Sequence, residues 1–284
     1  MGLNRNLIGK EYQPQDYGVT EEAIKRYALA YNDDNPWFFD SEKPEGIVAP
    51  PMFGVVMGWL PIMLVMTDTE LQIDLLRLLH SEQDMYFYRT VAPGDIITST
   101  AKILAIEEKA VGESLVVEVF SATQKKEPVQ RMLFTALIRG GRKKGRDSPV
   151  VISRTPVGDP LCRVSQTIDA DQTYRYAQAS GDHNPIHTDE NVAKMAGLPG
   201  IIVHGLCTMA FTSKVVIDNL CDGDPRRLRR LHGRFSRPVF PGQAITTVVW
   251  RLPDRDGTKV YAYETENPEG RAIIRDGIAE TALA

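Results

Sequence analysis

An internal repeat restricts the fold of this 284-residue chain more than any other feature of its sequence. When the chain is laid on itself so that Tyr27 meets Tyr176, YALAYNDDNPWF aligns with YAQASGDHNPIH, and Tyr, two Ala, Asp, Asn and Pro coincide. The repeat comprises residues 27–38 with 176–187, 46–52 with 200–206, and 87–94 with 235–242. Three matches in the same order indicate two copies of one domain.

The two copies meet in a charged, glycine-rich segment, RGGRKKGRDSP at residues 139–149. Hydrophobic alternation stops there, and such a segment cannot bury itself. We therefore place the boundary near residue 145, which predicts an N-terminal domain of residues 1–145 and a C-terminal domain of residues 146–284. We interpret the basic run as a solvated linker, with a contact for cofactor phosphates as the alternative.

The second copy combines one long helix with a series of strands. Apolar residues recur at helical spacing from Leu206 to Leu220, so a helix buried along one face begins near Gly205 and ends near Asp222. Runs rich in β-branched and aromatic residues predict strands at residues 244–252, 259–264 and 271–278, with counterparts at 96–103, 115–120 and 131–138. The predicted class is α+β, with an antiparallel sheet wrapping a long central helix in each copy.

Composition narrows the choice of partners. A net charge of −4 and a pI near 5.8 argue against a nucleic-acid partner. Three cysteines without CxxC spacing argue against a disulfide framework or a zinc cluster and favour a reducing, cytoplasmic location. The most apolar stretch, residues 52–66, is too short to cross a membrane and contains Pro61, so we expect buried core and no membrane partner.

Candidate chemistry gathers in SGDHNPIH at residues 180–187. Its Gly-Asp and Asn-Pro pairs are typical of turns, so the carboxylate of Asp182 and the imidazole of His187 can converge on one point, which we expect in an exposed turn. The glycine element GIIVHG at residues 200–205 leads into the long helix. Amides at a helix start are unpaired donors with positive partial charge, so the N–H near Gly205 suits an oxyanion.

The first copy keeps the turn-forming residues of this segment and lacks its reactive groups. Phe38 stands in place of His187, and Pro51 stands in place of Gly205. A phenyl ring cannot move a proton, and proline has no N–H to donate. The pattern predicts one catalytic half, the second, and one half that holds substrate.

Three segments of the second copy resemble MaoC-like, (R)-specific enoyl-CoA hydratases of the hydratase 2 type. They are YxYAxASGDxNPIH at residues 174–187, HGLCT at 204–208 and RFSRPVFPGQ at 234–243. In the first copy the likeness is weaker, although GIVAPPMF at residues 46–53 resembles the N-terminal half of double-hotdog hydratases. The resemblance implies two hotdog domains side by side, equivalent to a dimer of the single-domain enzymes.

The resemblance also implies roles for individual residues. His187 takes a proton from water, and Asp182, or the pair acting through the water, returns a proton to the α-carbon on the same face. Asn184 orients the catalytic loop, the Gly205 N–H polarises the thioester carbonyl, and the backbone at Phe235 touches the CoA-side arm of the substrate.

The implied activity is the reversible hydration of a trans-2-enoyl-CoA to a 3-hydroxyacyl-CoA, so the chain is expected to be a hydro-lyase whose partner is its acyl-CoA substrate. The alternatives are a branched or dicarboxylic substrate such as mesaconyl-CoA, a 3-hydroxyacyl-ACP dehydratase, or a non-catalytic acyl-CoA binder or hotdog thioesterase, although His187 counts against a thioesterase. Motifs for dinucleotides, ATP or serine hydrolysis and a histidine–carboxylate ligand set do not occur, so we expect no cofactor and no metal. The oligomeric state stays open, with a homodimer as one option.

An apolar stretch in the first copy, residues 55–66, suggests where an acyl chain could lie. Gly58 and Pro61 would interrupt the central helix expected there, and an interrupted helix leaves room for a chain. We therefore expect the first half to set substrate length.

The remaining histidines are assigned structural roles. We expect His183 to be exposed and His204 to support the catalytic loop. His80 and His232 have no partner at metal-ligand spacing, so we expect them on the surface or satisfied by hydrogen bonds.

Overall fold

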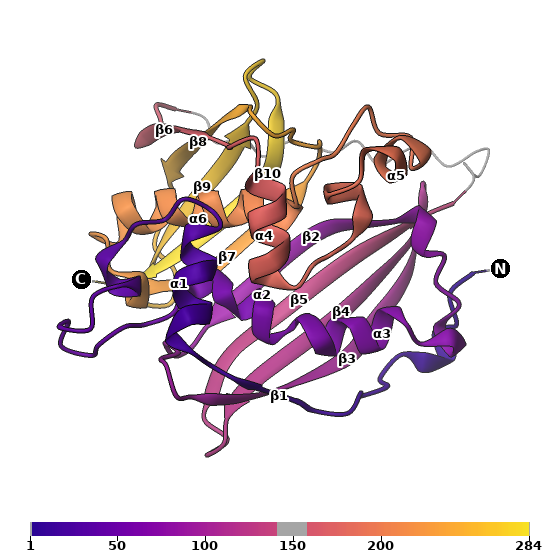
Figure 1. The fold of residues 1–284 in the computed structure, drawn as a ribbon, viewed down its shortest axis with the longest axis horizontal. Helices are drawn as coiled ribbons and strands as arrows, with labels where there is room; N and C mark the ends of the chain where they lie inside the picture. Colours follow the sequence, from indigo (N-terminus) through magenta and orange to yellow (C-terminus); the bar gives the residue numbers. More distant parts are fainter. Residues whose placement is uncertain (1, 141–157, 284) are drawn as a thin grey trace.

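The computed structural model describes residues 2–140 and 158–283 and is built on one ten-stranded antiparallel sheet (Figure 1). The first copy supplies β1 (Gln15–Gly18), β2 (Leu78–Phe87), β3 (Ile96–Lys109), β4 (Gly112–Thr123) and β5 (Pro128–Arg139). The second supplies β6 (Cys162–Thr167), β7 (Leu228–Phe235), β8 (Ala244–Arg251), β9 (Thr258–Glu266) and β10 (Ala272–Ala282). The predicted domain boundary near residue 145 and most of the basic run around it lie outside the described residues.

The strand order reveals a two-fold relationship between the copies. It runs β1-β3-β4-β5-β2-β7-β10-β9-β8-β6, so each half has the same arrangement and the halves join through β2 and β7. At this junction Asp84 faces His232, its counterpart in the other copy. Arg230 of β7 also donates from Nε and Nη2 to the two carboxylate oxygens of Asp84, at 2.8 Å each. The duplication seen in the sequence is therefore a duplication of structure, and the α+β double-hotdog prediction is confirmed.

All six strands predicted from the sequence are present, as β3, β4, β5, β8, β9 and β10. The two junction strands, β2 and β7, were not predicted. They carry charged residues on one face, such as Glu82 and Arg230, and these form cross-strand pairs in the assembled sheet. Charged residues on one face of a segment do not by themselves predict a strand, because the opposite charges that stabilise them lie on another strand.

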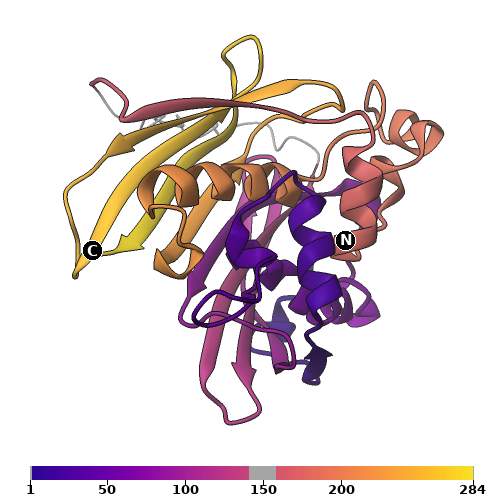
Figure 2. The same cartoon turned by 60° about the vertical axis from the view of Figure 1, so that its left-hand side comes forward.

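The helices differ between the copies in one important way. The equivalent helices α1 (Glu21–Leu29) and α4 (Gln172–Ser180) lie side by side, and α5 (Glu190–Met195) follows the segment that carries Asp182 and His187. The predicted long helix of the second copy is α6 (Gly205–Leu220), which runs along one face of the C-terminal strands in Figure 2. Within the described part of the chain, no helix combines the length and the apolar character needed to span a bilayer.

The corresponding helix of the first copy is broken into α2 (Gly54–Met57) and α3 (Trp59–Met66). The predicted interruption is confirmed, but it falls at Gly58 and not at Pro61. Gly58 has φ −87° and ψ −5° and lies against the sheet, where a Cβ atom would come within 2.5 Å of Met132 Cε. Pro61 lies in the first turn of α3, where a missing N–H costs no helical hydrogen bond.

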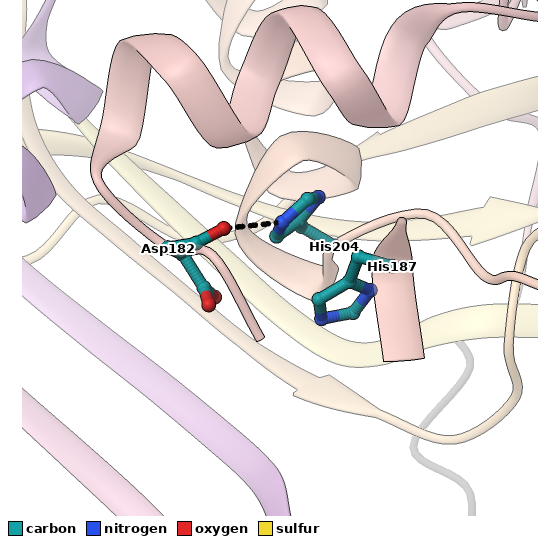
Figure 3. A group of neighbouring side chains, drawn as sticks. All are labelled: Asp182, His187 and His204. Carbon is teal, nitrogen blue, oxygen red and sulfur yellow. Dashed lines mark hydrogen bonds between the residues drawn. The ribbon is translucent and has the colours of Figure 1, made fainter. Parts of the chain in front are cut away.

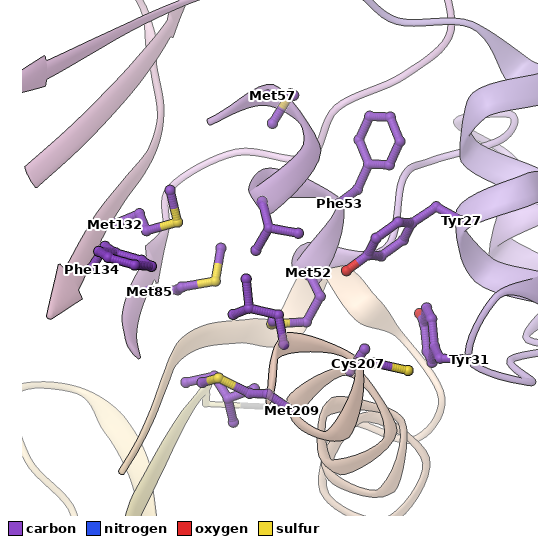
Figure 4. Close-up of a cluster of buried hydrophobic side chains, with 14 of the residues drawn as sticks. Tyr27, Tyr31, Met52, Phe53, Met57, Met85, Met132, Phe134, Cys207 and Met209 are labelled. Atoms are coloured by element: carbon purple, nitrogen blue, oxygen red, sulfur yellow. The ribbon is translucent and has the colours of Figure 1, made fainter. Parts of the chain in front are cut away.

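One hydrophobic core joins the two halves. Figure 4 shows Tyr27, Met52 and Phe53 of the first copy beside Cys207 and Met209 of α6, and all five side chains are buried. Because the copies share this core as well as the sheet, the site described next is held by side chains from both.

Candidate active site

The segment that carries Asp182 and His187 is a tight turn held by its own side chains. Helix α4 ends at Gly181, whose φ of +82° favours glycine. Asp182 Oδ1 accepts a hydrogen bond from Asn184 N at 3.1 Å, and Asn184 Oδ1 accepts one from Ile186 N at 3.3 Å. Asn184 thereby caps a 3₁₀ turn, Pro185–His187, whose last residue carries the imidazole.

The ring of His187 has a defined tautomer. Its Nδ1 lies 2.8 Å from the carbonyl oxygen of Ile202, and a carbonyl oxygen can only accept, so Nδ1–H is the donor. The proton on Nδ1 leaves the lone pair on Nε2 free to accept a proton. The side chain is 7% exposed, and burial lowers the pKa of His187, which keeps the ring neutral at neutral pH.

A second histidine lies directly on the first (Figure 3). The rings of His204 and His187 are stacked with centroids 3.8 Å apart and planes 27° apart. His204 Nε2–H donates to the backbone carbonyl of Asp182 at 3.0 Å, as expected for a residue that supports the loop. Burial lowers the pKa of His204 to about 2, and its Nδ1 is buried without a partner among the described residues.

The carboxyl group of Asp182 completes the cluster. One of its oxygens and one ring nitrogen each of His187 and His204 lie within 4.8 Å of one another. Burial raises the pKa of Asp182, while the adjacent His187 opposes that rise. The turn is exposed at residues 183–185, but the expectation of exposure is wrong for the two candidate side chains. Asp182 is half-buried and His187 is buried, because Ile202 and His204 cover the imidazole.

Gly205 lies at the start of α6, as predicted, and follows His204 directly. The side chain of His204 makes no capping hydrogen bond, and no described residue accepts one from Gly205 N–H. The half-buried amide therefore remains available to a ligand. A Cβ atom at Gly205 would lie 3.2 Å from the ring of Phe235, so glycine permits this close approach.

Phe235 connects the site to the first half of the chain. Its ring covers Gly205 on one side and meets the ring of His80 of β2 on another, with centroids 4.9 Å apart. His80 Nε2–H donates to the carbonyl of Glu82 at 3.2 Å, and burial lowers its pKa to about 4. His80 is thus a hydrogen-bonded, neutral histidine as expected, and His183 is exposed as expected.

The first copy has the same turn with a different electrostatic partner. Asp33 accepts a hydrogen bond from Asn35 N at 3.0 Å, as Asp182 does from Asn184. However, Asp33 is 1% exposed and pairs with Lys214 of α6, whose Nζ lies 3.3 Å from Oδ1. Sequence reasoning missed this lysine, because the ion pair spans the two halves.

The residue that corresponds to Lys214 in the first copy is Leu60, since Pro51 aligns with Gly205. Lys214 reaches Asp33 from α6, whereas Leu60 of α3 follows Trp59, whose indole lies next to Gly181. The alignment therefore gives an apolar residue in the first half where the second half carries the cation that pairs with Asp33. The charge of this one position separates the two halves electrostatically.

Helix α3 lies beside the turn that carries Asp182 and His187. A Cβ atom at Gly181 would lie 3.3 Å from Trp59 Cδ1, so the indole packs against the turn. Leu60, the next residue, and Leu64, about one turn further on, are 55% and 37% exposed. Large exposed apolar side chains next to a polar site are typical of a ligand-binding surface.

The equivalent place in the first half is almost filled. A cavity of about 40 Å³ remains there, lined by residues that include Pro51 and Phe87, the counterparts of Gly205 and Phe235. This volume suffices for a water molecule and is far too small for an acyl thioester.

Asp182, His187 and His204 are also the one group of three potential metal ligands found among the described residues. Two features disfavour a metal ion there. His187 Nδ1 and His204 Nε2 are occupied by backbone carbonyls, and the free nitrogens belong to two nearly parallel rings, whose in-plane lone pairs do not converge on one point. The absence of a metal stays a prediction.

Fold and site together define a double-hotdog protein in which one half carries a neighbouring carboxyl group and imidazole. Family models agree with this division: a MaoC-like domain matches residues 152–271, and a FAS1-like dehydratase domain region matches residues 6–132. The second half of the chain is therefore a MaoC-like domain, and the first half matches a dehydratase region.

Relatives of similar length support the family over the whole chain. The "Probable enoyl-CoA hydratase 2" of Dictyostelium discoideum is 26% identical over 97% of this chain and 95% of that protein. The 3-hydroxyacyl-thioester dehydratase Y of Mycobacterium tuberculosis is 28% identical over 99% of both chains. The crystal structure of a MaoC-like dehydratase from Phytophthora capsici shares the fold, with a TM-score of 0.84, 22% identity and coverage of 100% and 98%.

Proposed function

We propose that this chain is a hydro-lyase that reversibly adds water to a trans-2-enoyl-CoA, giving a 3-hydroxyacyl-CoA, with Asp182 and His187 as its acid–base pair. The observation that carries the proposal is a neutral, buried His187 that has a free Nε2 and one ring nitrogen within 4.8 Å of an Asp182 carboxyl oxygen. The enoyl-CoA hydratase and 3-hydroxyacyl-thioester dehydratase names of the relatives support the same reaction class.

In the hydration direction, His187 Nε2 removes a proton from water while the water oxygen bonds to the β-carbon. The π electrons of the double bond move to give an enolate, with negative charge on the thioester oxygen. The enolate then collapses as a protonated Asp182 gives its proton to the α-carbon, on the same face as the added water. The proton on His187 then passes to the Asp182 carboxylate, which restores the starting state of the pair. The raised pKa of Asp182 favours a carboxyl group that can donate a proton, and the lowered pKa of His187 favours a neutral imidazole that can accept one.

The Gly205 N–H is the proposed donor to the thioester oxygen. It lies at the positive end of α6 and has no other described partner, so it is already oriented when the enolate charge develops. Phe235 shields this donor from solvent on one side, and a drier surrounding strengthens the hydrogen bond.

His204 acts as a positioning residue in this scheme. Its ring supports the plane of His187, and its Nε2–H holds the backbone of Asp182, so it fixes the two reacting groups relative to each other. Because its pKa lies near 2, it stays neutral and does not compete for the proton.

We further propose that the acyl chain lies against α3. The break at Gly58, the indole of Trp59 and the exposed Leu60 and Leu64 form an apolar surface beside the catalytic turn. A surface of this kind fits a hydrocarbon tail, which favours an unbranched enoyl substrate over a dicarboxylic one such as mesaconyl-CoA.

The test is a spectrophotometric assay of crotonyl-CoA, a longer trans-2-enoyl-CoA and mesaconyl-CoA, following loss of the conjugated thioester absorbance. Hydration of the first two with preference over mesaconyl-CoA is expected. A parallel assay for free thiol detects a thioesterase. Release of CoA without hydration, or binding of all three thioesters with no turnover, would overturn the proposal.

A further inference from the structure

Two arginines near the site occupy positions that can be matched residue by residue with the first half. Ser236 N donates to the carbonyl of Ile273 at 2.9 Å, where the end of β7 meets β10. Tyr88 N donates to the carbonyl of Val129 at the same distance, where β2 meets β5. These equivalent bonds fix the register of the two strand ends.

In this register Arg237 corresponds to Arg89, and Arg271 corresponds to Glu127. Arg89 and Glu127 form an ion pair in the first half. The same two positions in the second half carry two positive charges. The reversal of charge occurs in the half that also carries Asp182 and His187.

No carboxylate among the described residues neutralises the two guanidinium groups. Arg237 Nη1 donates to the carbonyl of Ala272 at 2.8 Å, which holds its guanidinium next to the backbone of Arg271. Both arginines are exposed, and no described carboxylate forms an ion pair with either, including Glu269 in the preceding turn. Two adjacent like charges repel each other unless an anion lies between them.

The pair also lies close to the thioester site. Arg237 is two residues beyond Phe235, whose ring covers Gly205. We infer that Arg237 and Arg271 form an anion subsite that binds phosphate groups of the thioester carrier and so selects phosphorylated carriers over neutral thioesters. Arginine suits this task because its planar fork of donors matches the oxygens of a phosphate.

The inference rests on the proposed hydration of acyl thioesters and names the carrier that the site prefers. Its test compares three substrates with one acyl group: crotonyl-CoA, crotonyl-phosphopantetheine and crotonyl-pantetheine, which has no phosphate. The quantity measured is the preference for each phosphorylated substrate, expressed as its kcat/KM divided by that of crotonyl-pantetheine. We expect Arg237→Gln with Arg271→Gln to reduce the preference about tenfold or more, mainly through KM.

The matched control is Arg89→Gln, the same change at the equivalent position of the first half, which should leave the preference unaltered. A reduction for both phosphorylated substrates assigns the site to the phosphate that CoA shares with a carrier-protein arm, and a reduction for crotonyl-CoA alone assigns it to the nucleotide phosphates. An unchanged preference overturns the inference. Calorimetric binding of free CoA to the same variants reports on the subsite even if the wild-type chain hydrates none of these thioesters, so the two proposals can fail separately.

Discussion

The hydroxyl oxygens of Tyr27 and Tyr176 lie 3.1 Å apart in the buried centre of the molecule, where one donates a hydrogen bond to the other. The two residues are 149 positions apart in the chain and occupy the same place in the two copies, on α1 and α4. Their rings are in contact, with centroids 5.7 Å apart. The two-fold relationship of the sheet thus extends to the helices. The two halves share one arrangement of elements and differ in individual residues.

The acid–base assignment makes the two equivalent aspartates respond differently to substitution. Asp182→Asn and His187→Gln should each reduce kcat for crotonyl-CoA by several orders of magnitude, because each removes a proton-transfer group. Asp33→Asn should reduce kcat far less. It should instead lower the free energy of unfolding by about 1–3 kcal/mol, because Asp33 is buried against Lys214. Equal losses of kcat at Asp33 and Asp182 would contradict a single active half.

The Gly205 amide can be removed without altering the backbone that carries it. Proline is tolerated at the first position of a helix, and His204, with φ −55° and ψ 134°, already has the conformation that a residue before proline adopts. Gly205→Pro should therefore reduce kcat about 100- to 1000-fold through loss of one oxyanion donor.

Gly205→Ala is the control, because it adds a Cβ atom beside Phe235 but retains the N–H. Steady-state kinetics of the two variants separate steric crowding from loss of the hydrogen bond. If the alanine variant were as impaired as the proline variant, the amide would have no special role.

The neutral His204 should make the protein less stable in mild acid. Folding lowers its pKa from the ordinary 6.5 to about 2, so below 6.5 the unfolded chain binds a proton that the folded chain does not. Stability therefore falls as the pH decreases from about 6.5, with this residue contributing up to about 1.4 kcal/mol per pH unit.

His204→Gln removes that contribution and still offers an amide N–H to the carbonyl of Asp182. Urea unfolding at a series of pH values should show a shallower acid dependence for this variant than for the wild type. Activity at neutral pH should survive better in His204→Gln than in His204→Leu, which has no donor. Identical acid slopes for wild type and His204→Gln would refute the assigned neutral state.

Leu60→Lys would make the second half resemble the first. The new ammonium group should approach Asp182 as Lys214 approaches Asp33, which would favour the ionised carboxylate and place a charge on the proposed acyl surface. We expect a loss of kcat/KM that grows with acyl-chain length, measured with crotonyl-CoA and a long-chain trans-2-enoyl-CoA. Leu79→Lys, at another exposed leucine, is the control. A loss of kcat/KM that does not depend on chain length would contradict the proposal that the acyl chain lies against α3.

Much of the architecture could be predicted from residue identities. The aligned blocks predicted a duplicated α+β domain, and the strongest strands and the helix after Gly205 were found where expected. The junction strands β2 and β7 could not be recognised in this way, because their charged residues become compatible with a sheet when opposite charges such as Asp84 and Arg230 meet across strands.

The sequence by itself determined which half carries a carboxylate, an imidazole and a glycine amide, because these are properties of single residues at fixed spacing. Only the tertiary structure decided their chemical state. The tautomer of His187 depends on the Ile202 carbonyl, the neutrality of His204 depends on burial, and the pairing of Asp33 depends on Lys214 from the other half. Hydrogen bonds and Coulomb forces act over a few ångströms of space, so they follow the folded path of the chain and not the spacing of its residues.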